Sequence, residues 1–277
     1  MRTLASSVLL IIAALSVAAA PALSAPPADP LNSPMWADMV AKLLANGSVV
    51  IDDRVKVIVP SVVENQAQVP VTADARAVDG VVKMIVFADL NPVQHILTLT
   101  PAKAAPYVSF RLKVEQATPV RAAALTPDGV WHVGSVYLNA SGGGCSATAM
   151  ARNDAEWSTS VGQAQGKMWL EPDGLSRARF RVRHPMDTGL AKDGTPVFII
   201  EKLDLKGASG EPLATIELHE PVGEDPTLTM LLKMAPGDAS LNIEGRDNNG
   251  SIYRSKIPAP GRQSNLITPA TATATPC

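Results

Sequence analysis

The chain has 277 residues and a formal net charge of −2, and aromatic residues make up 4% of it. Nucleic-acid binding needs clustered positive charge and rings on which bases can stack, so we exclude nucleic acid as a partner. The length predicts one or two domains, at about 100–200 residues per domain.

The first residues have the pattern of a secretory signal. Met1 and Arg2 give a positive start, residues 8–20 form an apolar run, and Ala22-Leu23-Ser24 offers small residues for cleavage. The apolar run is shorter than the roughly 20 residues that a membrane-spanning helix needs. We therefore predict a signal peptide over residues 1–24, export of the protein, and no membrane span after cleavage.

One helix is predicted near the start of the mature chain. Ser33 or Asn32 can cap it, Pro34 suits its first turn, and Asn46-Gly47 is a typical end. Apolar residues recur at helical spacing, namely Trp36, Met39, Val40, Leu43 and Leu44. We expect this helix to pack against an edge or mouth of a sheet.

The rest of the chain is predicted to be all-β. Short β-rich runs separated by Gly, Pro, Asn and Asp turns fill residues 55–138, and a second such series fills residues 167–257. This pattern favours two immunoglobulin-like antiparallel β-sandwich domains. We place them at residues 25–150 and 162–258, joined by a polar linker at 151–161 and followed by a flexible tail at 259–277 that is rich in Pro, Ala and Thr.

The candidate functional residue is Cys145, which follows Gly142, Gly143 and Gly144. Glycine lacks the Cβ atom, so the loop can adopt conformations that bring the thiol out from the surface. A sulfur on such an arm suits a covalent carrier. The alternatives are an ordinary turn with a buried cysteine, or one half of a disulfide.

The local sequence does not activate this thiol. Residues 139–151 contain no Lys, Arg or His that could stabilise a thiolate. We therefore expect Cys145 to be acted upon by another enzyme. His132 is the best partner if the protein were a thiol enzyme, although strand alternation favours a packed or rim position for it. His184 is expected to hold its own loop by hydrogen bonds or to border the Cys145 loop.

Other polar residues give weaker signals. His95 and His219 are isolated in the sequence, so we expect no structural zinc site. The acidic residues Glu217, Glu220, Glu224 and Asp225 are interpreted as a solvated face.

The second cysteine, Cys277, ends the chain. We hypothesise that a Cys145–Cys277 bridge, if formed, is a reversible cover for the carrier thiol.

Several motifs together resemble a SoxY-like domain fused to a SoxZ-like domain. In the first half these are VKVIVP at residues 55–60, VEN at 63–65, QVPV at 68–71, IVFADLNP at 85–92, DGVW at 128–131 and the Gly-Gly-Cys before Ser146. In the second half they are HPMDTGL at residues 184–190 and DNNGSIY at 247–253. The SoxY arm reads Gly-Gly-Cys-Gly-Gly at the end of its chain, whereas here Ser146-Ala147 follow Cys145 and the chain continues.

The resemblance implies a non-enzymatic, periplasmic carrier. Cys145 matches the SoxY-type cysteine and would hold a covalent sulfur adduct, with no permanently bound cofactor or metal. Implied partners are small sulfur compounds and periplasmic redox enzymes, either of the Sox type or of a quinoprotein dehydrogenase and cytochrome c system, because the fused arrangement is similar to quinoprotein-associated carriers. The alternative is a structural or adaptor component of a quinoprotein (PQQ) alcohol dehydrogenase system with a disulfide-forming cysteine.

Overall fold

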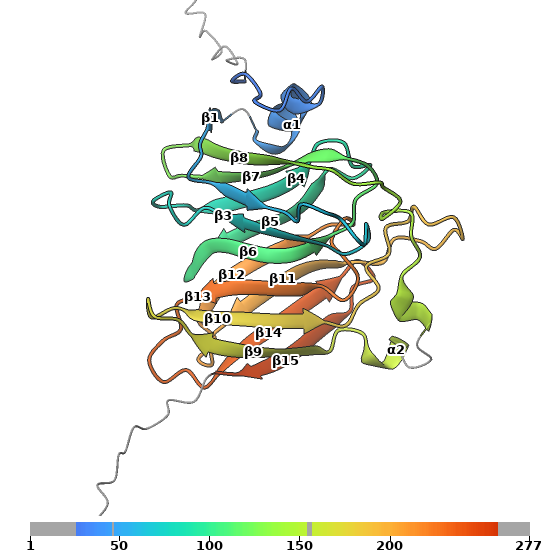
Figure 1. Cartoon of the computed structure of the whole chain (residues 1–277). Helices are drawn as coiled ribbons and strands as arrows, with labels where there is room; N and C mark the ends of the chain where they lie inside the picture. The colour runs from blue at the N-terminus through green and yellow to red at the C-terminus, as the bar shows by residue number, and fades with distance from the viewer. Residues whose placement is uncertain (1–25, 46, 154–156, 260–277) are drawn as a thin grey trace, which may run out of the picture.

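The computed structural model describes residues 26–45, 47–153 and 157–259, and it consists of two β-sheets stacked face to face (Figure 1). The nine-stranded sheet has the spatial order β1 (Ser48–Ile51), β8 (Val130–Leu138), β7 (Thr118–Leu125), β4 (Lys83–Ala88), β5 (His95–Pro101), β12 (Pro212–Leu218), β11 (Ile200–Lys206), β14 (Ser240–Asp247) and β15 (Ile252–Pro258). The six-stranded sheet has the order β2 (Lys56–Ile58), β3 (Val69–Asp74), β6 (Ala104–Leu112), β13 (Thr227–Leu232), β10 (Ser176–Val182) and β9 (Ala164–Leu170). The predicted all-β sandwich with a short N-terminal helix is confirmed.

The two halves of the chain are joined edge to edge in both layers. β5 pairs antiparallel with β12, and β6 pairs antiparallel with β13. Buried residues from both halves form one continuous hydrophobic cluster between the sheets. The sequence did not predict that the two sandwiches would share their sheets and their core. The edges of β5, β6, β12 and β13 would otherwise expose unpaired N–H and C=O groups, and each is closed by a strand of the other half.

The longer of the two α-helices in the described part of the chain, α1 (Trp36–Leu43), lies on the outer face of the nine-stranded sheet at the top of Figure 1. Trp36 and Met39 pack with Phe87 on β4 and with Trp131 on β8. The expectation of a sheet edge or mouth is therefore wrong. Strand β7 is buried along almost its whole length because the core covers one of its faces and the α1 cluster, through Ala123, covers the other.

The helix is shorter than predicted. Its N-cap is Met35, which makes no side-chain capping bond, and the Ser33 hydroxyl accepts a hydrogen bond from the Met35 N–H (3.3 Å) before the helix begins. Its C-cap is Leu44, so the helix ends before Gly47.

Two local elements were not predicted. β1 pairs with β8 in parallel, which departs from an otherwise antiparallel arrangement. The segment interpreted as a linker contains a 3₁₀ helix, η1 (Met150–Asn153), and the short helix α2 (Trp157–Ser160). In Figure 1 this segment runs down one side of the sandwich, from β8 in the upper half towards β9 in the lower half.

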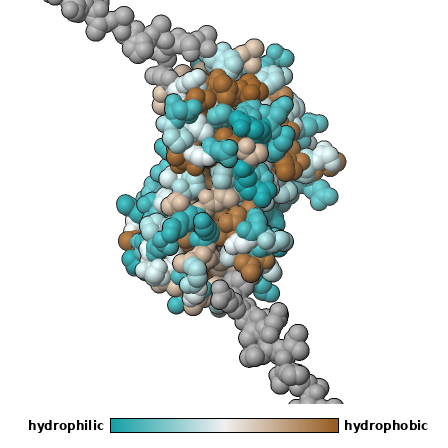
Figure 2. All heavy atoms as spheres, turned by 90° about the vertical axis from the view of Figure 1, so that its left-hand side faces the viewer, coloured by the Kyte–Doolittle hydropathy of each residue, from teal (hydrophilic) through white to brown (hydrophobic). Residues whose placement is uncertain are grey.

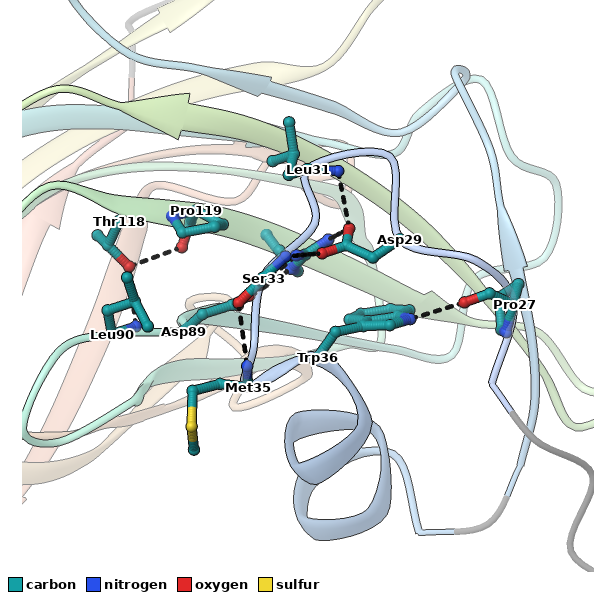
Figure 3. A network of polar contacts seen from close by, with 11 residues as sticks. Pro27, Asp29, Leu31, Ser33, Met35, Trp36, Asp89, Leu90, Thr118 and Pro119 are labelled. Carbon is teal, nitrogen blue, oxygen red and sulfur yellow. Dashed lines mark hydrogen bonds and ion pairs between the residues drawn. The ribbon is translucent and has the colours of Figure 1, made fainter.

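A buried ionic network fixes the segment before α1 (Figure 3). The Arg121 guanidinium, on β7, is fully buried and donates hydrogen bonds to the carboxylates of Asp29 (2.8 and 2.9 Å) and Asp89 (2.9–3.1 Å). It also lies over the Trp36 ring, 4.4 Å from the centroid, and the indole N–H of Trp36 donates to the Pro27 carbonyl (2.8 Å). A buried cation needs such partners, because an unpaired one pays its full desolvation cost.

The exposed surface is mixed in character. The face in Figure 2 interleaves hydrophilic and hydrophobic side chains, so single exposed apolar residues there need no special explanation.

We predict that Asp89→Asn destabilises the protein by about 3–5 kcal/mol, because it leaves the buried Arg121 charge undercompensated. Urea unfolding of the mature protein measures this. The control is Asp38→Asn on the exposed side of α1, which should change the free energy of unfolding by less than about 0.5 kcal/mol. Equal unfolding midpoints for Asp89→Asn and the unchanged protein would refute the role given to the network.

Candidate functional site

The Cys145 thiol is buried in the loop that follows β8, with only 2% of the residue exposed. Its S–H group donates to the Lys113 carbonyl oxygen (3.5 Å), and its backbone N–H donates to Glu115 (3.0 Å). The expectation that the glycine loop brings the thiol out from the surface is therefore wrong for this conformation. The loop instead folds back onto the segment that follows β6.

The glycines explain this close packing. Gly142 has a φ of +94°, and a Cβ atom there would lie 2.1 Å from the Glu115 carbonyl oxygen. A Cβ atom at Gly144 would lie 2.0 Å from the Gln66 carbonyl oxygen. Gly143, with a φ of +86°, faces open space. Two of the three glycines thus permit backbone contact that no other residue allows, and all three residues belong to the closed loop.

Glu115 holds the loop in place. Its carboxylate accepts hydrogen bonds from the Cys145 N–H (3.0 Å), the Ser146 N–H (3.1 Å) and the Ser146 hydroxyl (3.0 Å). The Gly144 N–H adds a bond to the Val114 carbonyl oxygen (2.8 Å). Hydrogen bonds to a charged acceptor are stronger than neutral ones, so Glu115 is the main residue that holds this loop closed.

The second half of the chain completes the site. The Thr188 hydroxyl donates to the Cys145 carbonyl oxygen (2.6 Å), and the Lys113 ammonium donates to the Met186 carbonyl oxygen. Both Met186 and Thr188 belong to the HPMDTGL loop. The cysteine therefore sits at the junction of the two halves, with contacts to each.

The turn between β4 and β5 holds the backbone segment that carries Glu115. The Asn91 side-chain amide donates to the Lys113 carbonyl oxygen (2.9 Å), and its oxygen accepts from the Glu115 N–H (3.1 Å). Asn91 is itself buried. This residue fixes the backbone that carries both Lys113 and Glu115.

The electrostatics keep the thiol protonated. Burial, followed by the negative charge of Glu115, raises the pKa of Cys145 to about 12, and the Lys113 charge acts in the opposite direction. Burial lowers the pKa of Lys113 to about 8, against the charges of Asp187, Cys145 and Glu224. In the closed loop Cys145 is therefore a protected, unreactive thiol.

Neither candidate histidine contacts the thiol in the part of the chain described. His132 lies on β8 with its Nδ1 atom 2.7 Å from the Asp52 carboxylate. His184 is fully buried; its Nδ1 accepts from the Met186 N–H (3.1 Å), and its ring lies 4.3 Å from that of Phe198. His184 thus shapes the loop that supplies Thr188, and it reaches Cys145 only indirectly.

The other two histidines are brought together although they are far apart in sequence. His95 and His219 stack across the β5–β12 seam with ring centroids 4.0 Å apart. Burial, followed by the charge of His219, lowers the pKa of His95 to about 4. They form a neutral ring pair, and neither ring is among the hydrogen-bond partners of Cys145 described above.

Part of the acidic stretch is structural. Asp225 accepts a hydrogen bond from the His184 N–H (3.0 Å) and forms a salt bridge with Arg183 (3.0 Å). Glu224 accepts from the Met150 N–H (2.6 Å). The interpretation of a solvated face is wrong for these two residues, because both tie loops together around the site.

Some predictions lie outside the described residues, namely the signal peptide, Cys277 and the proposed Cys145–Cys277 bridge. Cys145 forms no disulfide with any residue that the structure describes. Within residues 26–45, 47–153 and 157–259, no cluster of His, Cys, Asp and Glu suits a metal ion. The same ranges contain no helix long and apolar enough to cross a membrane.

Comparison with known proteins identifies both halves. Residues 40–145 match the family model described as sulfur oxidation protein SoxY, and residues 170–258 match that described as sulphur oxidation protein SoxZ. Among solved structures, the sulfur carrier protein SoxY from Chlorobium limicola f thiosulfatophilum is 17% identical over 37% of this chain and 92% of its own, with a TM-score of 0.34. A β-glycosidase from Bacteroides vulgatus is 11% identical over 74% of this chain and 25% of its own, with a TM-score of 0.22. No curated protein matches the chain.

The protein is thus a two-layer β-sandwich whose two halves each match a family model of sulfur oxidation proteins. More specifically, the chain contains a SoxY domain and a SoxZ domain fused in one polypeptide, and the SoxY match ends at Cys145.

We predict that Glu115→Gln speeds alkylation of Cys145 by iodoacetamide by about tenfold at pH 8. The substitution loosens the loop that buries the thiol, which is the main cause of its raised pKa, and it removes the negative charge that adds to that rise. Mass spectrometry of the modified protein over time measures the rate. Glu64→Gln, at an exposed glutamate, is the matched control and should react like the unchanged protein. An unchanged alkylation rate in Glu115→Gln would show that Glu115 does not hold the loop closed.

The alkylation rate of the unchanged protein should also rise with pH by about tenfold per unit from about pH 7 to about pH 10, without levelling off near 8.5. A raised pKa means that the thiolate fraction is still small and growing over this range. A plateau near pH 8.5 would show that the thiol spends most of its time exposed to solvent.

Proposed function

We propose that this protein is a periplasmic, non-catalytic carrier that holds sulfur-containing groups covalently on Cys145 and presents them to partner redox enzymes. The observation that carries the proposal is that Cys145 stands at the end of the SoxY match and is held jointly by residues of the SoxY and SoxZ domains. The apolar run at residues 8–20 supports export.

The closed loop fits the requirements of a carrier. The free thiol must be protected until it is loaded, and a neutral thiol in a buried site reacts slowly with unspecific oxidants. Loading requires the loop to open, which breaks the bonds from Glu115 and Thr188 but no element of either sheet. Opening is therefore a local event, of the kind that loops of low stability undergo.

The proposed partners are small sulfur compounds and periplasmic redox enzymes, either of the Sox type or of a quinoprotein dehydrogenase and cytochrome c system. The contacts of Cys145 argue against catalysis by the protein itself. Its hydrogen-bond partners are Lys113, Glu115 and Thr188, and none of them is a histidine that could take the thiol proton.

A structural or adaptor role is the second candidate, and the burial of Cys145 is the observation that favours it. A buried cysteine is commonly a small hydrophobic residue of the core. In that case the thiol would bear no group, and the fused domains would serve only as a binding module of a quinoprotein (PQQ) alcohol dehydrogenase system.

Intact-mass spectrometry of the protein from its native compartment, with and without reductant, separates these functions. We predict a reducible mass increase of a sulfur-containing group that is absent from the Cys145→Ser variant. A bare thiol under all growth conditions, or a loss of two hydrogens only, would contradict the carrier function and leave the structural one.

A further inference from the structure

The outer face of the six-stranded sheet carries a concentration of basic side chains. On β10, which lies in the lower half of Figure 1, Arg177, Arg179 and Arg181 are exposed and alternate with buried Ala178 and Phe180. This period of two places all three guanidinium groups on the solvent face.

Neighbouring strands extend the basic surface. Lys167 on β9 lies opposite Arg179, and Trp169 lies opposite Arg177. On the other side of β10, Thr227 of β13 lies opposite Arg181. A shallow depression of about 560 Å³ lies over these strands, and its lining includes Thr227 and, from the end of β6, Arg111. We call this surface the basic groove and define it by Arg111, Lys167, Trp169, Arg179 and Arg181.

The positive charge of the groove is not balanced within the described part of the chain. Arg177, beside the groove, forms a salt bridge with Glu171 (2.7 Å), and Arg181 lies 3.9 Å from Asp225, a carboxylate that Arg183 approaches more closely (3.0 Å). Arg111, Lys167 and Arg179 make no salt bridge with any described residue. These three cations stand together on a protein whose formal net charge is −2.

The groove adjoins the carrier site. The Arg111 carbonyl oxygen accepts a hydrogen bond from the Gly223 N–H (2.7 Å). Two residues later in the chain, the Lys113 carbonyl oxygen accepts a hydrogen bond from the Cys145 thiol. The Glu224 carboxylate, next to Gly223, binds the backbone of Met150 in the segment that leaves the Cys145 loop. A protein bound in the groove would therefore lie next to this loop.

We propose that the basic groove is a docking surface for an acidic patch, a cluster of Asp and Glu side chains, on a partner protein that acts on Cys145. The link to Cys145 rests on the proposed function, whereas the groove itself does not. Three uncompensated cations attract a carboxylate cluster from a distance and orient it before contact. Trp169, which is 39% exposed, supplies an aromatic side chain of the kind that anchors protein interfaces.

The groove favours an acidic protein over other polyanions. Of the two aromatic residues in its lining, Trp169 is exposed and Phe180 is buried, so the groove offers no series of exposed rings for stacked bases. The remainder of the protein carries net negative charge, which repels a long polyanion or an anionic membrane but leaves a compact acidic patch free to bind.

The test uses a fluorescein-labelled ten-residue peptide of Asp and Glu, with a Ser and Gln peptide of equal length as the neutral control. Binding to the mature protein is followed by fluorescence anisotropy at low and at physiological salt. The groove variant is Lys167→Gln with Arg179→Gln. The matched control is Lys83→Gln with Lys256→Gln, which removes the same charge from exposed positions on β4 and β15.

We expect the groove variant to bind the acidic peptide about tenfold more weakly, with a reduced salt dependence, and the control variant to bind like the unchanged protein. Carbodiimide coupling, which joins a carboxylate to a lysine amine with loss of water, should link the peptide mainly to Lys167. The proposal would be overturned if both variants weakened binding equally, or if coupling were spread over Lys83 and Lys256. It would also be overturned if the protein bound single-stranded DNA or phosphatidylglycerol vesicles more tightly than the peptide.

The same measurements on Cys145→Ser separate this inference from the carrier function. Peptide binding should be unchanged in that variant, because the thiol takes no part in the groove. Peptide binding therefore tests the docking surface, and the adduct mass tests the carrier function.

Discussion

The pairing of the two domains through β5 with β12 and β6 with β13 is the constraint on which the candidate site depends. Because both sheets continue from one domain into the other, the HPMDTGL loop of the SoxZ domain has a fixed position against the end of β6. That position lets Thr188 bond to Cys145 and lets Lys113 bond to Met186. Separate sandwiches joined only by a linker would hold these groups together by local concentration alone.

Within this frame, the Cys145 loop is held closed by a few specific groups. Glu115 binds two backbone N–H groups and one hydroxyl, and Asn91 fixes the backbone of Glu115 from the other side. The closed loop raises the thiol pKa, and the charge that closes the loop also contributes to that rise. Closure and chemical protection therefore have a common cause. Release of Glu115 would expose the thiol and favour its reactive form at the same time.

The sequence was sufficient to predict the fold class, most strand positions and Cys145 as the candidate residue, because these follow from alternation, turn residues and the Gly-Gly-Cys motif. It was not sufficient to predict that the Cys145 thiol is buried and has a raised pKa. Glu115 and Lys113 lie about thirty positions before Cys145 and bear no local relation to it, so their contacts appear only once β6 and β8 are placed. The packing role of Gly142 and Gly144 was hidden for the same reason, since glycine permits both mobility and close backbone contact. The HPMDTGL motif was sufficient to single out His184, but nothing in the sequence indicates that the His184 N–H donates to Asp225, about forty positions later.

The central claim is that Cys145 carries a group by opening a closed loop while both sheets stay intact. Hydrogen–deuterium exchange of the mature protein, free and with a sulfur adduct formed on Cys145, tests this most directly. The account predicts that the free protein protects the Cys145 and Ser146 amides and that the adduct removes this protection without changing exchange in β6 and β8. If the folded protein accepted no adduct, or if β6 and β8 lost their protection along with the loop, the account would be contradicted.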